Sequence, residues 1–167
     1  PFRVLFTKFP YASAFGGGEL HTLQLAEGLI HKNAEVYFVG SCGILLEEFK
    51  KRGLWYKKAW GGIEAVSKFA VLIFPLTALL ILLRLFWLLL NYRLFHKIDV
   101  LYCMSLNEKL LLSLPARLLG IRVYWVEHLL IERWLIQNPF RFLYVWMSQF
   151  VTVVAVSEAV RSQLLTI

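Results

Sequence analysis

Acidic residues and cysteines are scarce in this chain. It has 11 Asp and Glu against 18 Lys and Arg, so the net charge is +7. A basic balance points to an anionic membrane surface or a phosphate-rich ligand. No nucleic-acid-binding motif is recognisable, so we expect no nucleic-acid partner. Cys42 and Cys103 lie far apart in apolar sequence. We expect both to be buried thiols in a reducing compartment.

The sequence also lacks a nucleophilic triad and any group of Cys and His at metal-ligand spacing. We therefore expect no metal and no cofactor. Internal repeats and low-complexity tracts are missing too. Residues 1–167 are accordingly expected to form a single domain. The chain begins at Pro1 and stops inside a predicted helix, so we expect it to be a fragment of a longer protein.

Apolar residues are abundant, at 59% of the chain, and the mean hydropathy is +0.62. Short apolar runs bounded by turn residues predict strands, and spacings of three and four predict helices. The predicted strands are residues 2–7, 34–40, 54–60, 98–104, 121–128 and 151–157. The predicted helices are residues 19–32, 44–53, 64–97, 106–120, 138–150 and 158–165. This alternation predicts an α/β, Rossmann-like parallel sheet with helices on both faces.

Three consecutive glycines, Gly16 to Gly18, follow the first predicted strand and precede a helix. Backbone N–H groups at a helix start lack partners and form an anion site, which glycine leaves open to a ligand. A P-loop is excluded because Glu19 and Leu20 follow instead of Lys and Ser or Thr. The dinucleotide fingerprint is excluded because His21 replaces its third glycine. A flexible connection that binds nothing remains an alternative.

Four stretches resemble, in the same order, the landmarks of glycosyltransferase family 4 N-terminal domains. FGGGELHTLQLAEGLIHKNAEVYFVG resembles the GG-x-E loop, helix and second strand of that family. HKIDVLYCMS resembles its Pro-Asp-Val strand, with Ile98 in place of proline. GIRVYWVEHLLIERW resembles its strand ending in histidine, and VTVVAVSEAVRSQL its V-A-V-S-E-x-V segment. Together these stretches span nearly the whole chain.

The resemblance implies a GT-B architecture, in which two Rossmann-like domains enclose the active site. This chain would be the N-terminal, acceptor-side domain. The C-terminal domain would grip the nucleotide-sugar donor through a Glu-x7-Glu motif. The enzyme would be a retaining glycosyltransferase of the hexosyltransferase type, and it would be incomplete without that domain.

The resemblance also implies the site residues. His128 would be catalytic, positioning sugar hydroxyls or stabilising charge; a structural histidine at a strand end is the alternative. The residues expected to bind substrate are Gly16, Gly17, Gly18, Glu19 and Ser157. Glu127 and Glu132 flank the histidine, and Glu132 is more typical of a solvated face. His21 is expected to be a surface or packing residue, and His31 and His96 are expected to be exposed loop or helix-end residues.

Residues 69–90 form a 22-residue apolar run, long enough to span a bilayer. Spanning would separate the glycine loop from His128, so we expect residues 69–94 to form a membrane-associating helix within the domain. It would lie in the interface, dip into it, or pack against protein. Five cations precede it, at Lys50, Lys51, Arg52, Lys57 and Lys58, and Trp55, Trp60, Trp87 and Tyr92 suit an interface. We therefore expect a peripheral or monotopic protein on the cytoplasmic face of the membrane.

The sequence therefore predicts a glycosyltransferase that moves a sugar from a nucleotide-sugar to a glycan or lipid-linked acceptor in envelope polysaccharide synthesis. Two alternatives remain. A membrane-embedded, non-catalytic interaction protein would hold Gly17 and His128 far apart. A GT-B sugar-nucleotide epimerase would share the fold but need no acceptor.

Overall fold

A computed structural model describes residues 1–9, 15–130 and 133–167 of the chain. Six parallel strands form one sheet in the order β3-β2-β1-β4-β5-β6. The strands are β1 (Arg3–Lys8), β2 (Glu35–Gly40), β3 (Trp55–Lys58), β4 (Val100–Cys103), β5 (Arg122–Glu127) and β6 (Thr152–Ala155). The predicted α/β, Rossmann-like fold is confirmed, and each predicted strand is present at nearly its predicted position.

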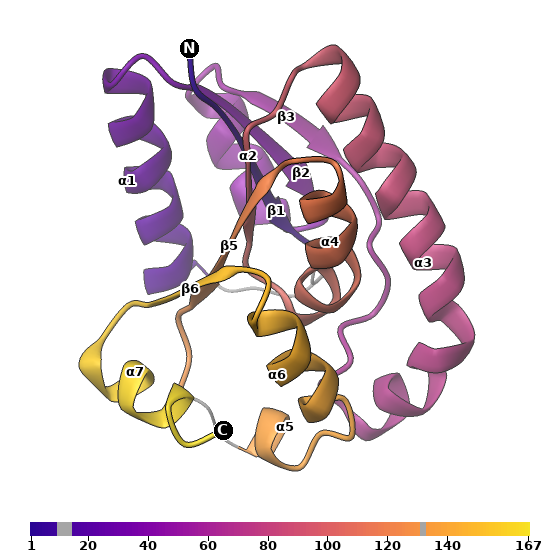
Figure 1. Ribbon diagram of the computed structural model, residues 1–167. Coiled ribbons are helices and arrows are strands. Elements are labelled where there is room, and N and C mark those ends of the chain that lie inside the picture. Colours follow the sequence, from indigo (N-terminus) through magenta and orange to yellow (C-terminus); the bar gives the residue numbers. More distant parts are fainter. Residues whose placement is uncertain (10–14, 131–132) are drawn as a thin grey trace.

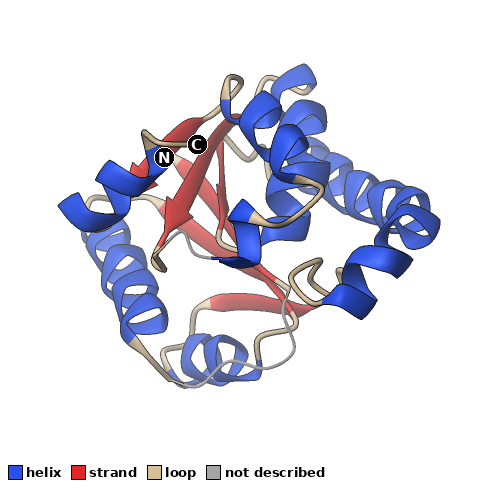
Figure 2. Ribbon diagram, turned by 90° about the horizontal axis from the view of Figure 1, so that it is seen from below, coloured by secondary structure: helices blue, strands red, loops and turns tan. Residues whose placement is uncertain are grey.

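Helices cover both faces of the sheet, as Figures 1 and 2 show. The helices are α1 (Gly17–His31), α2 (Gly43–Lys51), α3 (Lys68–Phe95), α4 (Leu106–Leu118), α5 (Arg133–Ile136), α6 (Arg141–Ser148) and α7 (Glu158–Leu164). Apolar residues of α1 and α2 pack on one face. Those of α3, α4 and α6 pack on the other. The short helix α5 was not predicted.

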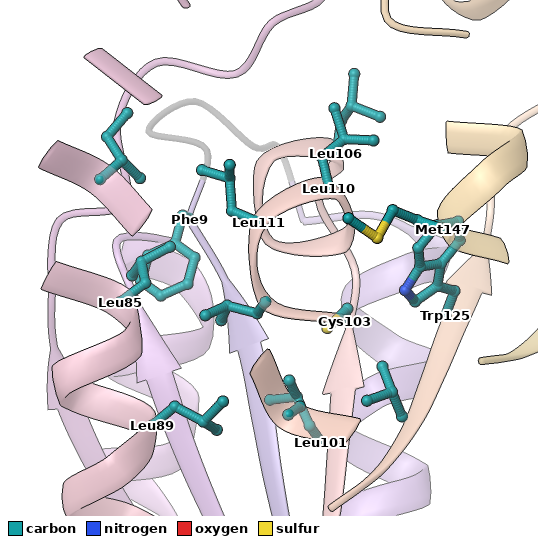
Figure 3. Packing of buried hydrophobic residues seen from close by; sticks show 14 of the residues in the cluster. Phe9, Leu85, Leu89, Leu101, Cys103, Leu106, Leu110, Leu111, Trp125 and Met147 are labelled. Atoms are coloured by element: carbon teal, nitrogen blue, oxygen red, sulfur yellow. The ribbon is translucent and has the colours of Figure 1, made fainter. Parts of the chain in front are cut away.

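Strand side chains alternate between two buried clusters, because successive residues of a strand point to opposite faces. In β1, Val4 and Phe6 join the α1–α2 layer, whereas Leu5 joins the α3–α4–α6 layer. Figure 3 shows the second layer, to which Leu85 and Leu89 of α3 and Leu101 of β4 belong. Cys42 and Cys103 are both buried, as the sequence predicted. They belong to opposite layers.

The first helix begins at Gly17, two residues earlier than predicted. Its first hydrogen bond runs from the N–H of Leu20 to the carbonyl of Gly16, at 3.0 Å. Gly17 and Gly18 therefore form the first turn of α1 rather than a loop before it. Their N–H groups consequently belong to the helix start, where no carbonyl of the same helix can accept from them.

The connection from β3 to α3 is held by Asn107 of α4. Its side-chain amide donates to the carbonyls of Gly61 at 3.2 Å and Ile63 at 2.9 Å, and its oxygen accepts from the N–H of Ala65 at 3.2 Å. Gly62 has a φ of +87°, and its Cα faces Ile81 of α3 too closely for a side chain. These contacts fix residues 61–65 against the carboxyl edge of the sheet.

Candidate functional site

A cleft of about 830 Å³ lies at the carboxyl edge of the sheet. It sits beside the central strands β1 and β4, where the strand order reverses, which is the usual ligand position in open α/β sheets. Residues from the ends of β1, β4 and β5, the starts of α1 and α4, and the β3–α3 connection line it. They are Lys8, Gly16, Gly17, Gly18, Glu19, His21, Glu64, Val66, Met104, Ser105, Leu106, Lys109, Glu127, His128, Leu129 and Val156.

The glycine turn and His128 meet in this cleft. A Cβ at Gly18 would lie 3.3 Å from Cγ and 3.4 Å from Cδ2 of the imidazole, so glycine allows the helix start to approach the ring. A Cβ at Gly17 would meet no protein atom within 4 Å among the described residues. The backbone of Gly17 therefore faces open space, into which a ligand can fit.

Glu19 also lies in the cleft, but its carboxylate is engaged by protein groups. One oxygen accepts from the ammonium of Lys8 and the other from the N–H of Gly16 at 3.1 Å. Burial by itself would raise the pKa of Glu19, yet the bonds from Lys8 and the backbone outweigh it and lower the pKa. Glu19 thus holds the glycine turn to the end of β1, and its contact with substrate stays a prediction.

His128 is half-buried and neutral at physiological pH. Burial, followed by the nearby His21, Lys109 and Lys8, lowers the pKa of His128 to about 4. Its Nε2 is buried and has no hydrogen-bond partner among the residues that the structure describes. A neutral imidazole with a free nitrogen can bond an uncharged hydroxyl group. His21, predicted to be a surface or packing residue, lies in the same cleft with its ring centroid 5.3 Å from that of His128.

Below His128 lies a buried ion pair that sequence reasoning missed. Lys109 of α4 donates to Glu127 at 2.6 Å and to the carbonyl of Val126 at 3.2 Å. The hydroxyl of Tyr144 donates to the same Glu127 oxygen at 2.7 Å. Lys109 and Glu127 are 2% and 3% exposed, so the pair has little contact with bulk water although both residues line the cleft. It anchors the end of β5, and therefore His128, to α4.

Two carboxyl groups occupy the N-terminus of α4. Glu64 accepts from the N–H of Leu106 at 2.8 Å, and Glu108 accepts from the N–H groups of Met104 at 2.7 Å and Ser105 at 2.9 Å. Complete burial raises the pKa of Glu108 to about 8, even though these bonds lower it. Glu108 is therefore mostly protonated at neutral pH.

The remaining histidines and predicted site residues are not among the described lining of the cleft. Ser157 is not among the lining residues; its hydroxyl caps α7 by accepting from the N–H of Val160 at 3.3 Å. Glu132 lies outside the described residues. His31 is exposed at the end of α1, and His96 lies at the end of α3, so both are at helix ends as predicted; His96 is half-buried because it stacks on Tyr92 at 4.9 Å. Within the described ranges, no cluster of His, Cys, Asp and Glu could hold a metal ion.

The sequence profile of Glycosyltransferase Family 4 matches residues 15–167. The chain belongs to this family. The match includes the glycine turn, His128 and every element from α1 onward. No curated protein sequence matches the chain.

Solved structures share the fold of this family member. A glycosyltransferase from Rickettsia africae ESF-5 superposes with a TM-score of 0.67 at 20% identity, over 98% of this chain and 39% of that protein. Anabaena HepE, solved with UDP and glucose, gives 0.68 at 12% identity over 99% and 41%. The UDP-GlcNAc 2-epimerase of Methanocaldococcus jannaschii gives 0.58 at 16% identity over 99% and 42%. The chain thus spans about two fifths of these proteins and has the fold of a GT-B N-terminal domain.

Proposed function

We propose that this domain forms the acceptor-side wall of the active site of a retaining glycosyltransferase. The enzyme would transfer a sugar from a nucleotide-sugar to a glycan or lipid-linked acceptor in envelope polysaccharide synthesis, and it would need a C-terminal domain for activity. The observation that carries the proposal is the shared cleft of the glycine turn and His128 in a family 4 member.

The start of α1 is suited to binding a negatively charged donor. Helix N-termini attract phosphate through free N–H groups and the helix dipole. Lys8 lies on the same wall, where its ammonium pairs with Glu19. HepE, which shares the fold, was solved with UDP and with glucose. We therefore propose that the donor diphosphate reaches the N–H groups of Gly17 and Gly18.

His128 would position sugar hydroxyls rather than act as a nucleophile. Its imidazole is neutral, and its buried Nε2 has no hydrogen-bond partner among the described residues, so we propose that a sugar hydroxyl pairs with it when the cleft is occupied. Three carboxylates line the described part of the cleft, and each already accepts a hydrogen bond: Glu19, Glu64 and Glu127. This wall would thus orient the sugar, while the opposite domain would hold the nucleotide.

Substitution in the full-length protein tests the proposal, with nucleotide release from a panel of nucleotide-sugars as the readout. We expect His128→Ala to lower kcat/KM by about 100-fold, a typical loss for a positioned group in the transition state. Gly18→Ala should also lower it, because the new methyl group presses on the imidazole ring. Gly28→Ala, on the open side of the same helix, is the matched control and should leave kcat/KM unchanged. Equal turnover by all three variants would refute the proposal.

The two alternatives fare differently. A non-catalytic interaction protein requires Gly17 and His128 to lie apart, whereas both line one cleft. An epimerase stays a second candidate because a sugar-nucleotide epimerase shares the fold. Interconversion of a nucleotide-sugar without any acceptor would favour the epimerase. Transfer that depends on an added acceptor would favour the glycosyltransferase.

A further inference from the structure

The outward side of α3 is apolar along the whole helix, although it faces no other part of the described chain. Its inner side, with Ile81, Leu85 and Leu89, is buried on the sheet. The outward side chains are 56–80% exposed and recur at spacings of three and four; we call them the outer face of α3. They are Phe69, Leu72, Leu76, Leu79, Leu80, Leu83, Trp87, Leu94 and Phe95. A surface helix of a soluble domain normally carries polar residues there.

Positive charge is concentrated around this helix. Residues 53–97, from before β3 to just after α3, hold six of the 18 Lys and Arg but one of the 11 Asp and Glu. The cleft does not account for this excess, because it is lined by two lysines and three glutamates. Lys57 and Lys58 are exposed on the edge strand β3, and Lys68 is exposed at the start of α3. The excess charge therefore accompanies the apolar surface.

Aromatic and cationic side chains border the outer face. Trp60 and Trp87 are 46% and 66% exposed. The guanidinium of Arg84 lies 5.8 Å from the ring centroid of Trp60. Trp55 of β3 packs on Tyr92 of α3 at 5.4 Å, which joins the edge strand to the helix. Exposed tryptophans and cations beside an apolar surface are typical of the boundary between lipid acyl chains and headgroups.

The fold argues against α3 crossing a membrane. By length and apolar composition α3 could cross a bilayer. However, β3 before it and β4 after it belong to the same sheet, and the inner side of α3 forms part of the core. In Figure 1, α3 runs along the outside of the molecule, on the opposite flank from α1. One side of the helix is thus available to lipid along its full length.

We propose that the outer face of α3 binds an anionic lipid bilayer, with the helix lying in the plane of the interface. Apolar side chains enter the acyl boundary while Lys57, Lys58 and Lys68 contact anionic headgroups. Glu64 and Val66 line the cleft only a few residues before α3 begins, so the cleft opens beside the bilayer. Resting on the proposed function, this placement assigns a lipid-linked acceptor to the cleft.

Vesicle flotation of the full-length protein tests the surface. We expect binding to phosphatidylglycerol-containing vesicles, weaker binding to phosphatidylcholine vesicles, and a decrease as salt rises. Leu76→Gln with Leu80→Gln should lower binding about tenfold or more, because both leucines are exposed on the outer face. The matched control, Leu118→Gln with Leu165→Gln, changes two leucines that are equally exposed elsewhere and should bind like the unchanged protein. Equal binding by the two variants would overturn the proposal.

Spin labels placed singly at Leu72, Leu83 and Leu94 test the orientation. An in-plane helix gives all three the same shallow immersion depth, whereas a crossing helix gives a gradient of depth, which would refute the proposal. Failure of the unchanged protein to bind vesicles would also refute the proposal. The outer face of α3 would then contact a second copy of the protein or another domain. Donor turnover in detergent with a soluble acceptor should be the same for both leucine variants, so loss of docking is distinguishable from loss of catalysis.

Discussion

A single imidazole illustrates how the cleft sets the chemistry of its residues. His128 loses its charge because the protein surrounds it with apolar atoms and cations. An uncharged ring orients hydroxyl groups without attracting water or counter-ions. The same shift affects stability: the unfolded chain binds a proton near pH 6.5, whereas the folded ring binds one near pH 4. Between these values, stability contributed by His128 is lost as the pH falls.

Binding of an anion in the cleft should raise the pKa of His128, because negative charge favours the imidazolium. NMR titration of the ring in the full-length protein would show a pKa near 4 without ligand. Saturation with a nucleoside diphosphate should move it upward by about one unit or more. The exposed His31 lies outside the cleft and serves as an internal control. An unchanged titration of His128 with the ligand bound would contradict a site for the diphosphate at this wall.

Glu108 has the opposite dependence on pH. Its folded pKa of about 8 exceeds the ordinary value of 4.5, so the folded state becomes less stable as the pH rises between these values. Glu108→Gln keeps an oxygen for the N–H groups of Met104 and Ser105 and removes the charge. We expect the variant to match the unchanged protein at pH 5 and to exceed its unfolding free energy by about 2–4 kcal/mol at pH 9. Denaturant unfolding at both pH values measures this difference.

The exposed Glu47 on α2 offers a control for that measurement. Glu47→Gln replaces an exposed side chain and should change the unfolding free energy by less than about 0.5 kcal/mol at either pH. A Glu108→Gln variant that behaves in the same way would show that the carboxyl is already ionised in the folded state.

At the scale of elements, the contact between α4 and β5 depends on the buried Lys109–Glu127 pair. Lys109→Met would leave the Glu127 carboxylate buried, with Tyr144 as its remaining side-chain donor among the described residues. Removing one partner of a buried pair costs about 3–5 kcal/mol. We expect that loss in thermal or denaturant unfolding. Adding Glu127→Gln should recover part of it, since the amide oxygen still accepts from Tyr144.

Exposed Lys57 on β3 supplies the comparison for this substitution. Lys57→Met should change the unfolding free energy by less than about 0.5 kcal/mol. A loss no larger than this for Lys109→Met would mean that the pair contributes little to the packing of α4 on β5.

The alternation of strands and helices could be predicted because apolar runs and 3.6-residue periodicity are local properties of the sequence. The glycine turn and His128 were also recognisable, since the glycines lie between the first strand and its helix and His128 directly follows an apolar run, both at the ligand-binding edge. Lys109 was not, because a lysine within a leucine-rich helix gives no sign of which side it faces. Its burial depends on Glu127, 18 residues away. Glu64 was missed for the same reason, as its partner lies on α4.

At the scale of the whole molecule, the polar and apolar surfaces are segregated. The cleft combines two lysines with three glutamates, whereas the excess positive charge and the exposed leucines gather around α3. The proposed binding of a water-soluble donor and of a lipid surface would therefore use separate parts of the domain. The segregation arises from topology, because α3 is the connection from the edge strand β3 back to the central strand β4. This long crossover necessarily passes over one face of the sheet.

The two thiols report separately on the two layers of the fold. Cys42 lies in the layer formed with α1 and α2, Cys103 lies in the layer beneath α3 and α4, and both are fully buried. Alkylating reagents should therefore leave both unmodified in the native state, and burial raises the pKa of Cys103 as further protection. Under mild denaturant, mass spectrometry of alkylated peptides would show which layer opens first. Each native cysteine thus reports the local unfolding of one face of the sheet.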